Sequence, residues 1–454
     1  MLDCTLRLRR RAMICLFGGI GTLSLFAAPL TCSAAEPNAE TLVESQPTVS
    51  HTLDSLIHWA ERSNPRLRES AAGIQAARGK AYQAGLYPNP TLNGGGMQIG
   101  GRDSQYFSQL SQEIVTKHKL GLDQAAACQE VTQAELRFVR TRFELLTAVR
   151  KDYFSVLAAQ RKVTVLRRLI QLSSDVAESG RKLQAAGEGT RGDTLLFEIE
   201  LEKAEVSHEN AIAELRAARR QLATDLALHD APDLAVSGPL LQEPDGIIPF
   251  VNAAGFVPRN AEVQIAEREV NRSRFLLQRA EVQPFPNVTL STGYIYQVMS
   301  PHNLAILQAE IPIPVWNKNQ GNISAACAEV TKSQQAVART QLDIARQMAD
   351  AIGRYQQAQQ QVVRYRERII PRAQEGVKVA RSGLESGQLD LLRLLQTQRA
   401  LIDSSLSYLT SLQSRWSAAA DIAGLIQLED FPGTDAPIVP DEAEPADPPT
   451  AAAP

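Results

Sequence analysis

Apolar residues recur at three- and four-residue steps through a long stretch without proline, residues 117–229. In its first half these positions are Leu136, Val139, Phe143, Leu146, Tyr153, Leu157, Val163, Leu166 and Ile170. Such a stripe lies along one face of a helix and is typical of a coiled-coil seam. The pattern predicts a helix over 118–186, about 100 Å long at ~1.5 Å per residue. A glycine-rich turn then leads to a second helix over 193–228, so this part forms an antiparallel hairpin.

Two extended stretches precede this hairpin. Residues 91–101 and 105–115 predict two strands, joined by a turn at Gly-Arg-Asp-Ser. Apolar residues alternate only weakly there, and the glycines at 94–96 weaken the pattern further. Each strand is nevertheless about as long as a tilted strand that crosses a bilayer, ~10 residues.

The same succession of motifs occurs twice along the chain. The sequence Tyr-Pro-Asn-Pro-Thr-Leu at 87–92 returns as Phe-Pro-Asn-Val-Thr-Leu at 285–290, and Ala-Ala-Cys-Gln-Glu-Val at 126–131 returns as Ala-Ala-Cys-Ala-Glu-Val at 325–330. A nearly constant offset across several landmarks indicates an internal duplication. We therefore expect one repeat over 51–230 and a second over 251–428, separated by a proline-rich linker at 231–250.

The second repeat predicts the same elements as the first. Its strands are expected at 287–298 and 303–315, with Pro312 and Pro314 at the end of the second strand, where a missing ladder donor is tolerated. Its long helices are expected at 320–384 and 390–426. Pro371 should kink the first of them, because proline lacks the N–H and crowds the preceding turn.

The two ends of the chain differ from the repeats. Arginines near the start, an apolar run at 14–28 and Ser33-Ala34-Ala35 predict a secretory signal peptide over 1–35, followed by a linker over 36–50. The apolar run is short for a membrane anchor. Cys32 leaves a lipoprotein open as an alternative, although Thr31 precedes it. The Pro-, Ala- and acid-rich tail, 429–454, predicts disorder.

Composition excludes several classes of protein. The formal net charge of -3 over 454 residues argues against a nucleic-acid binder that neutralises phosphates. Cys128 and Cys327 are far apart, which fits neither a disulfide framework nor a metal site, and we expect both to be buried small residues. The six histidines are scattered, and no catalytic constellation stands out. We therefore expect neither an enzyme nor a cofactor or metal site.

Four strands of this length cannot close a barrel, and open sheet edges are not tolerated in a bilayer. Either the strands lie outside a membrane, or several chains share one barrel. Three chains would supply twelve strands and twelve long helices. The sequence after the signal peptide has no run of 18 apolar residues, which argues against helical membrane spans.

The two-fold repeat, long hairpins and strand pairs together resemble the TolC family of outer-membrane efflux proteins. Ala-Gly-Leu-Tyr-Pro-Asn-Pro-Thr-Leu at 84–92 and Ile-Pro-Val-Trp-Asn-Lys-Asn-Gln-Gly-Asn-Ile at 313–323 are similar to its CzcC-like heavy-metal branch. The resemblance implies a mainly α protein with a small β part. Three copies would form a 12-stranded barrel in the outer membrane, continued by a periplasmic α-helical barrel. It also implies a periplasmic adaptor and an inner-membrane pump of the RND type as partners.

The hairpin tips are where the resemblance places function. Gly187, Gly189, Gly383 and Gly387 would form the turns that contact the adaptor. Asp193 and Asp390 would form acidic rings that narrow the pore, with Arg393 in place of a second acid that some relatives carry. The alternative is that both acids only stabilise the first turn of a helix.

Two questions stay open at this level. A duct could pass divalent metal ions, drugs or a secreted polypeptide. A different class of protein, a periplasmic coiled-coil scaffold or adaptor, would also contain a long hairpin, but adaptors carry one hairpin between all-β domains.

Overall fold

The computed structural model describes residues 50–187, 189–228, 234–238, 240–241, 255–299, 303–386 and 391–429. The predicted signal peptide and the tail beyond Glu429 lie outside these residues, as do Asp390 and Gly387. No helix in the described part is both long and apolar enough to span a bilayer.

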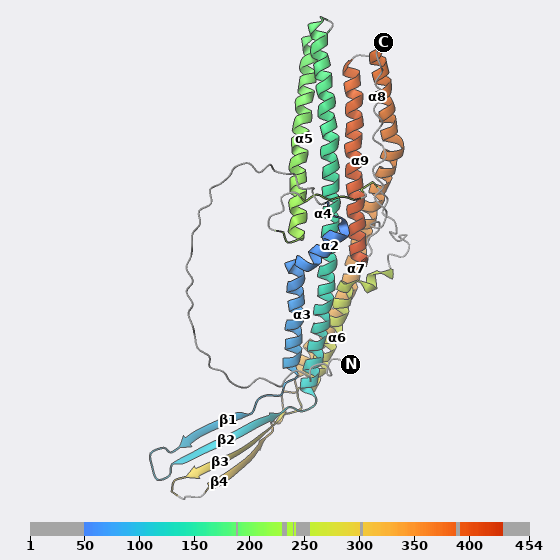
Figure 1. Ribbon diagram of the computed structural model, residues 1–454. Helices are drawn as coiled ribbons and strands as arrows, with labels where there is room; N and C mark the ends of the chain where they lie inside the picture. Colours follow the sequence, from blue (N-terminus) through green and yellow to red (C-terminus); the bar gives the residue numbers. More distant parts are fainter. Residues whose placement is uncertain are drawn as a thin grey trace, which may run out of the picture. The chain divides into compact units, whose positions relative to one another are not determined.

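The first repeat contains four helices: α2 (Leu53–Ser63), α3 (Pro65–Ala84), α4 (Lys119–Ala185) and α5 (Arg191–Asp225). Asn64 separates α2 from α3 and caps α3, since its side chain accepts a hydrogen bond from the Arg66 N–H. Pro65 occupies the first helical position, where its missing N–H costs nothing. Helix α4 lies antiparallel to α5, as Figure 1 shows, so the predicted hairpin forms.

The second repeat contains α6 (Ala261–Val282), α7 (Gln320–Arg364), α8 (Ile370–Glu385) and α9 (Leu391–Ile426). The one helix predicted over 320–384 is divided by a π-helical segment, Tyr365–Ile369. Pro371 comes shortly after this segment. Because proline cannot donate to the preceding turn, the widened π turn accommodates it, while the predicted kink stays a prediction.

The four strands form one antiparallel sheet in the order β1 (Thr91–Met97), β2 (Gln105–Ile114), β3 (Val288–Gln297) and β4 (Asn303–Glu310). The outer edges of β1 and β4 have no pairing strand among the described residues. Strand β2 pairs with β3, so the sheet joins the two repeats. Its strand order can be followed in Figure 1.

Two strands end earlier than the sequence predicts. The pattern extends β1 to residue 101, but the strand stops at Met97, because Gln98 and Gly100 adopt positive φ in a turn. The buried Ser104 hydroxyl closes this turn by donating to the Gln98 carbonyl at 2.8 Å. The pattern likewise extends β4 to residue 315, but the strand stops at Glu310, because Pro312 and Pro314 have no N–H for the ladder.

The two faces of the sheet differ in chemistry. One face carries mainly apolar and aromatic side chains, because the register aligns them across neighbouring strands: Leu92 beside Leu110, Tyr106 beside Tyr296, Tyr294 beside Ala305, and Leu307 beside Thr292. The opposite face is polar near the helical end, where Ser111 pairs with Ser291 and their hydroxyls lie 2.9 Å apart, and apolar farther out, where Phe107, Ile295 and Leu304 lie side by side. We call the first the apolar face and the second the polar face.

The helices form two layers that share α4, and α9 of one layer packs on α7 of the other. Toward the hairpin tips, α5 packs on α4, α4 on α9, and α9 on α8. Toward the sheet, α3 packs on α4, α4 on α6, and α6 on α7. Each layer is therefore four helices wide, with one helix at either edge that has no further partner in its row among the described residues.

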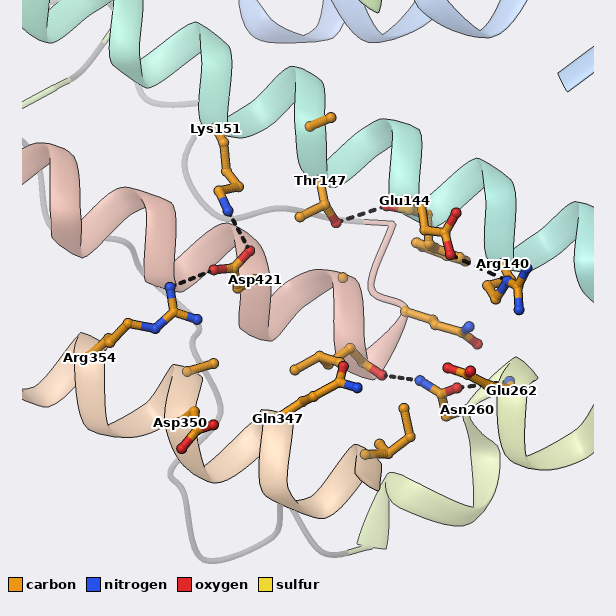
Figure 2. A pocket seen from close by; sticks show the side chains of 17 residues that line it. Arg140, Glu144, Thr147, Lys151, Asn260, Glu262, Gln347, Asp350, Arg354 and Asp421 are labelled. Atoms are coloured by element: carbon orange, nitrogen blue, oxygen red, sulfur yellow. Dashed lines mark hydrogen bonds and ion pairs between the residues drawn. The ribbon is translucent and has the colours of Figure 1, made fainter. Parts of the chain in front are cut away.

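A cleft lies between the two repeats, lined by residues of α4, α6, α7 and α9 (Figure 2). Its volume is about 520 Å³. Asp421 of α9 bridges two cations across it: Lys151 of α4 at 3.0 Å and Arg354 of α7 at 3.0 Å. This bridge ties α4, α9 and α7 together at the level where the two layers meet.

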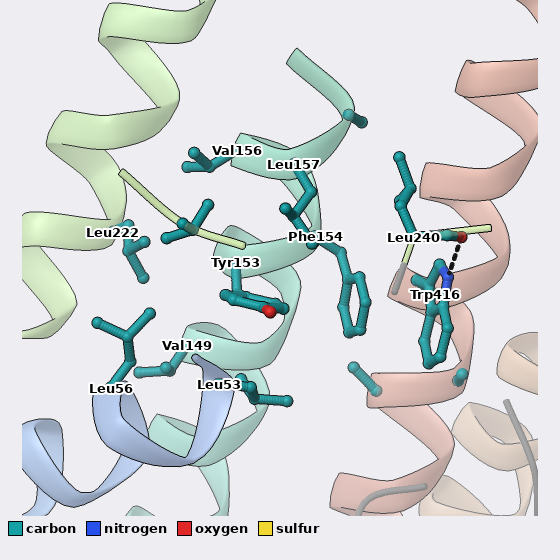
Figure 3. Packing of buried hydrophobic residues seen from close by; sticks show 14 of the residues in the cluster. Leu53, Leu56, Val149, Tyr153, Phe154, Val156, Leu157, Leu222, Leu240 and Trp416 are labelled. Atoms are coloured by element: carbon teal, nitrogen blue, oxygen red, sulfur yellow. Dashed lines mark hydrogen bonds between the residues drawn. The ribbon is translucent and has the colours of Figure 1, made fainter. Parts of the chain in front are cut away.

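The largest apolar core lies around the middle of α4 (Figure 3). Tyr153 and Phe154 project from α4, and the Phe154 ring stacks on Trp416 of α9 with centroids 4.1 Å apart. Helix α2 closes one side of the core with Leu53 and Leu56. This short helix thereby fixes the start of the first repeat against the long hairpin.

Arg150 interrupts the predicted seam, yet it is fully buried in this core. Its guanidinium donates to the backbone carbonyls of Leu428 and Glu429 beyond the end of α9.

The expectation that both cysteines are buried is wrong for the single chain: Cys327 is exposed, and Cys128 is half-buried. Both lie on the long helices that leave the sheet, where the single chain covers less of the helix surface than in the core.

Candidate functional site: the hairpin tips and the sheet

The turn between α4 and α5 is built from glycines. Gly187 follows the end of α4 with φ +80°, a conformation that side chains disfavour, and its N–H donates to the Gln184 carbonyl. The N–H of Gly189 reaches back to the Leu183 carbonyl at 3.2 Å. These bonds satisfy carbonyls at the helix end. The two predicted glycines of the first tip therefore shape the turn, whereas adaptor contact at this place stays a prediction.

A substitution at Gly187 tests this conformational requirement. We expect Gly187→Ala to destabilise the first hairpin by about 1–2 kcal/mol, because an L side chain in the left-handed region collides with its own backbone. Gly73→Ala is the matched control, since Gly73 lies exposed within α3 with nothing near the added methyl group. There alanine should stabilise the helix by up to about 1 kcal/mol. Thermal unfolding of both variants measures the difference, and equal shifts of the same sign would contradict it.

Asp193 lies in the first turn of α5, where it takes part in a reciprocal cap. The Thr190 hydroxyl donates to the Asp193 carboxylate at 2.6 Å, and the Asp193 N–H donates to the Thr190 hydroxyl at 3.2 Å. The Thr190 hydroxyl thus caps α5, and the carboxylate at the third helical position binds this hydroxyl, not the Thr190 backbone N–H that a complete capping box uses. The capping alternative thus accounts for Asp193 locally. A role for Asp193 in a pore gate remains a prediction.

The second tip is described only in part. Gly383 lies in the last turns of α8, where its carbonyl accepts a hydrogen bond from the Ser386 hydroxyl at 3.1 Å, and Arg393 lies in the first turn of α9. Asp390 and Gly387 lie outside the described residues, so their predicted roles at the second tip stay predictions.

The two hairpins contact each other near their tips. Phe197 of α5 packs with Val176, Ala177 and Leu395 in a small apolar cluster. A side chain at Gly180 would lie 2.5 Å from the Phe197 ring, so glycine permits this close approach of α4 and α5. Arg399 of α9 pairs with Glu200 of α5 at 2.6 Å, which adds a charged link between the hairpins that the sequence did not predict.

The helical end of the sheet is fixed by a buried amine. Lys119 begins α4 and is only 3% exposed. Its Nζ donates to the Asn287 side chain at 2.8 Å, and the Asn287 amide donates to Glu113 at 2.6 Å. Because Glu113 lies at the end of β2 and Asn287 precedes β3, this chain of contacts orients the sheet on the long helix.

Two carboxyl groups face each other beside the core. Asp152 of α4 is 9% exposed and neighbours Asp225 at the end of α5. Burial is the main cause that raises the pKa of Asp152, to about 7, and the Asp225 carboxyl raises it further. Burial also raises the pKa of Asp225, against the opposing effect of Arg66. Asp152 therefore binds a proton more tightly in the folded than in the unfolded protein.

This raised pKa predicts how stability depends on pH. Below an ordinary aspartate pKa of about 4, Asp152 is protonated in both the folded and the unfolded protein. The stabilisation of the folded protein that comes from its raised pKa is then complete. The contribution is lost as pH rises toward about 7. We expect Asp152→Asn to raise the unfolding temperature at about pH 8 and to change it little at about pH 4. Asp175→Asn, on the exposed face of the same helix, is the control. Equal effects at both pH values would contradict the assignment.

No group of three or more His, Cys, Asp or Glu side chains in the described ranges is arranged to hold a metal ion. The geometry that stands out is architectural: a two-faced sheet with open edges, and helical layers with open edges.

A match to known sequences fixes the class of protein. The model of the family described as outer membrane efflux protein matches residues 56–227 and 257–426. The chain belongs to this family, and the predicted TolC-family resemblance is confirmed. It is an outer-membrane efflux channel of the kind that works in tripartite systems, with a helical part in the periplasm, and it is not an enzyme. The family thus decides against the scaffold or adaptor alternative.

Individual relatives are distant. The chain is 24% identical over 416 residues to the cobalt-zinc-cadmium resistance protein CzcC of Cupriavidus metallidurans, covering 90% of this chain and 98% of that protein. Among solved structures it is similar to CusC, with a TM-score of 0.72 at 17% identity over 84% of this chain and 92% of that one. It is also similar to the MtrE outer membrane channel of Neisseria gonorrhoeae, with a TM-score of 0.71 at 18% identity over 82% of this chain and 88% of that one. These likenesses confirm the mainly helical fold with a four-stranded sheet.

Proposed function

We propose that three copies of this chain assemble into one continuous duct. The single observation that carries the proposal is the pair of open edges on β1 and β4. Backbone groups at a sheet edge must be paired inside a bilayer, and one chain cannot pair its own edges. Three four-stranded sheets joined edge to edge give twelve strands. The apolar face then meets lipid and the polar face lines the passage.

The helical layers support the same assembly. In the tip layer, α5 and α8 are the outer helices, and α5 presents exposed Leu195, Ile199 and Val206. In the sheet layer, α3 and α7 are the outer helices. Edge helices with uncovered apolar residues are suited to packing against a second copy. Twelve helices in each layer would continue the passage below the barrel.

We propose divalent heavy-metal cations as the cargo. The relative CzcC is named for resistance to cobalt, zinc and cadmium, and the similarity extends over most of both chains. Drugs or a secreted polypeptide are the alternative cargoes.

As partners we propose a periplasmic adaptor at the hairpin tips and an inner-membrane RND pump that supplies the energy. Asp193, Asp390 and Arg393 remain the candidates for a gate at these tips, and Gly187, Gly189, Gly383 and Gly387 for the adaptor contact.

The link between the hairpins predicts a gating effect. Glu200 accepts from Lys203 at 2.8 Å and from Arg399 at 2.6 Å, so its loss weakens the contact of α9 with α5 and leaves the apolar cluster around Phe197 as the remaining link. A part-buried ion pair contributes about 1 kcal/mol to the stability of the state that contains it. Its loss therefore changes the ratio of the linked to the separated state of the two hairpins about fivefold. We expect Glu200→Gln to increase the conductance of the isolated channel. Glu198→Gln is the control, because Glu198 pairs with Arg181 inside one hairpin. Planar-bilayer recording measures both variants, and equal conductances would contradict a role for the inter-hairpin pair.

Growth assays test the cargo. A strain that lacks this chain but keeps its adaptor and pump should become sensitive to cobalt, zinc or cadmium, and the intact chain should restore resistance. Sensitivity to drugs with unchanged metal resistance would replace the metal cargo by a drug cargo. Single-channel recording of the purified protein tests the duct itself, independently of what it carries.

A further inference from the structure

The two repeats hold the ends of their return helices in the same way. In the first repeat the Asn64 side chain donates to the Asp225 carbonyl at the end of α5, at 2.7 Å. In the second repeat the Asn260 side chain donates to the Leu425 carbonyl near the end of α9, at 2.9 Å. Each of these asparagines also caps a shorter helix, α3 in the first repeat and α6 in the second. The internal duplication therefore includes this helix junction.

The charges at the two junctions differ. Asp421 of α9 lies between two cations, Lys151 of α4 and Arg354 of α7, each at 3.0 Å. At the first junction the Asp152 carboxyl of α4 lies within hydrogen-bonding reach of the Asp225 carboxyl of α5. Opposite charges thus close the second junction, whereas the first brings together two groups that carry the same charge when ionised.

The contact between these carboxyl groups requires a proton. Asp152 is 9% exposed, and its Oδ2 is buried without a hydrogen-bond donor in the described part of the chain. Ionised carboxylates only accept hydrogen bonds, so two of them cannot bond to each other. One shared proton turns one of the two groups into a donor. Asp152 and Asp225 therefore attract each other when the pair holds a proton and repel each other when both are ionised.

The surrounding charges leave this behaviour in place. Burial is the main cause that raises the pKa of both carboxyl groups. Arg66 of α3 opposes the rise at Asp225, and Lys151 opposes it at Asp152, although the Lys151 amine also pairs with α9. From α2, Asp54 acts on the neighbours of Asp152 along α4. Together these effects place the pKa of Asp152 at about 7.

We propose that Asp152 and Asp225 form a proton-operated clasp between α4 and the end of α5, closed by a shared proton and opened by the repulsion of two carboxylates. Opening separates α5 from α4 at the base of the first hairpin. The second junction keeps its contacts, because two cations neutralise Asp421 there. The clasp belongs to a single chain and does not require the duct. In the proposed duct it would change the spacing of the wall helices with pH.

Infrared spectroscopy and a distance between spin labels test the clasp together. The full-length protein in detergent, with Cys128 and Cys327 replaced by serine, carries spin labels at Glu144→Cys on α4 and Gln221→Cys on α5, which are both exposed positions. Pulsed electron resonance measures the distance between the labels from about pH 5 to about pH 9, in the presence of a chelator. Infrared spectra of the unlabelled protein over the same range report the C=O stretch of protonated carboxyl groups.

We expect a protonated-carboxyl band that disappears with a midpoint near pH 7, and a distance that increases over the same range. In Asp152→Asn the amide donates to the Asp225 carboxylate, so the band should be lost and the distance should stay at its low-pH value throughout. Asp225→Asn should abolish the same titration, which keeps the test valid if the first variant fails to fold. Asp175→Asn, at an exposed position of α4, is the control and should retain both changes.

Three results would overturn the clasp. One is a band that titrates only near an ordinary aspartate pKa of about 4. Another is a distance change that persists in Asp152→Asn. The third is a distance that responds to removal of the chelator and addition of zinc but not to pH, which would assign the pair to a metal ion. Single-channel recording separates the clasp from the proposed function: a protein whose clasp titrates but which does not conduct contradicts the duct and leaves the clasp standing.

Discussion

Leu307→Arg is expected to prevent assembly of the channel in the outer membrane. Leu307 is 85% exposed in the middle of β4 on the apolar face, so an arginine there would point into hydrocarbon. Arginine on the lipid face of a barrel costs about 2–4 kcal/mol near the midplane. In a trimer this cost applies in each copy. We expect the variant to be lost from the outer-membrane fraction and to form few stable trimers.

Gln308→Arg is the matched control for this prediction. Gln308 follows Leu307 in the same strand but faces the other way, since it pairs with Ser291 on the polar face. An arginine there would lie in the water-filled passage. We expect normal assembly with a changed ion selectivity. Membrane fractionation and trimer yield compare the two variants, and normal assembly of both would show that the apolar face does not contact lipid.

Trp416→Ala should strongly destabilise the helical part of the protein. Trp416 is 1% exposed, stacks on Phe154 and donates its indole N–H to the Leu240 carbonyl at 2.9 Å. Truncation of a buried tryptophan to alanine costs about 3–5 kcal/mol. It would also leave a carbonyl without its donor. We expect a fall in the unfolding temperature of several degrees, or loss of the folded protein.

Trp59→Ala provides the comparison. Trp59 is 37% exposed on α2, where its ring meets His51 edge to face at 6.0 Å. Because much of this side chain is already in water, its removal should change the unfolding temperature far less. Circular dichroism during heating measures both variants. Similar shifts would indicate that the core around α4 does not carry the stability of the helical part.

The sequence predicted what periodicity and repetition determine. The seam through Leu146, Tyr153 and Leu157 specifies helix α4, and the Tyr-Pro-Asn-Pro motif with its echo at 285–288 marks the start of each strand pair. The class of protein followed from the resemblance of this repeated pattern to the TolC family. These features depend on local propensity and on spacing along the chain, which a single sequence displays directly.

Contacts between distant residues could not be predicted in this way. Arg150 interrupts the seam in the sequence, but carbonyls beyond α9 satisfy it in the fold. The Glu200–Arg399 link and the Asp152–Asp225 pair join helices far apart in sequence. The early end of β4 and the π-helical segment before Pro371 depend on how the backbone accommodates proline, which propensity alone leaves open.

Asp193 illustrates the limit for function. Its acidic side chain and position agree both with a pore ring and with a helix cap, and the bond from Thr190 accounts for the cap. A ring exists only in an assembly, where symmetry brings copies together. Residue type and local geometry therefore cannot decide between these roles.

The mass of the purified protein in detergent tests the central claim most directly. Open edges on β1 and β4 require that copies complete one another, so native mass spectrometry or light scattering corrected for detergent should give three chains per particle. A stable monomer that remains folded and resists aggregation in detergent would contradict the shared barrel.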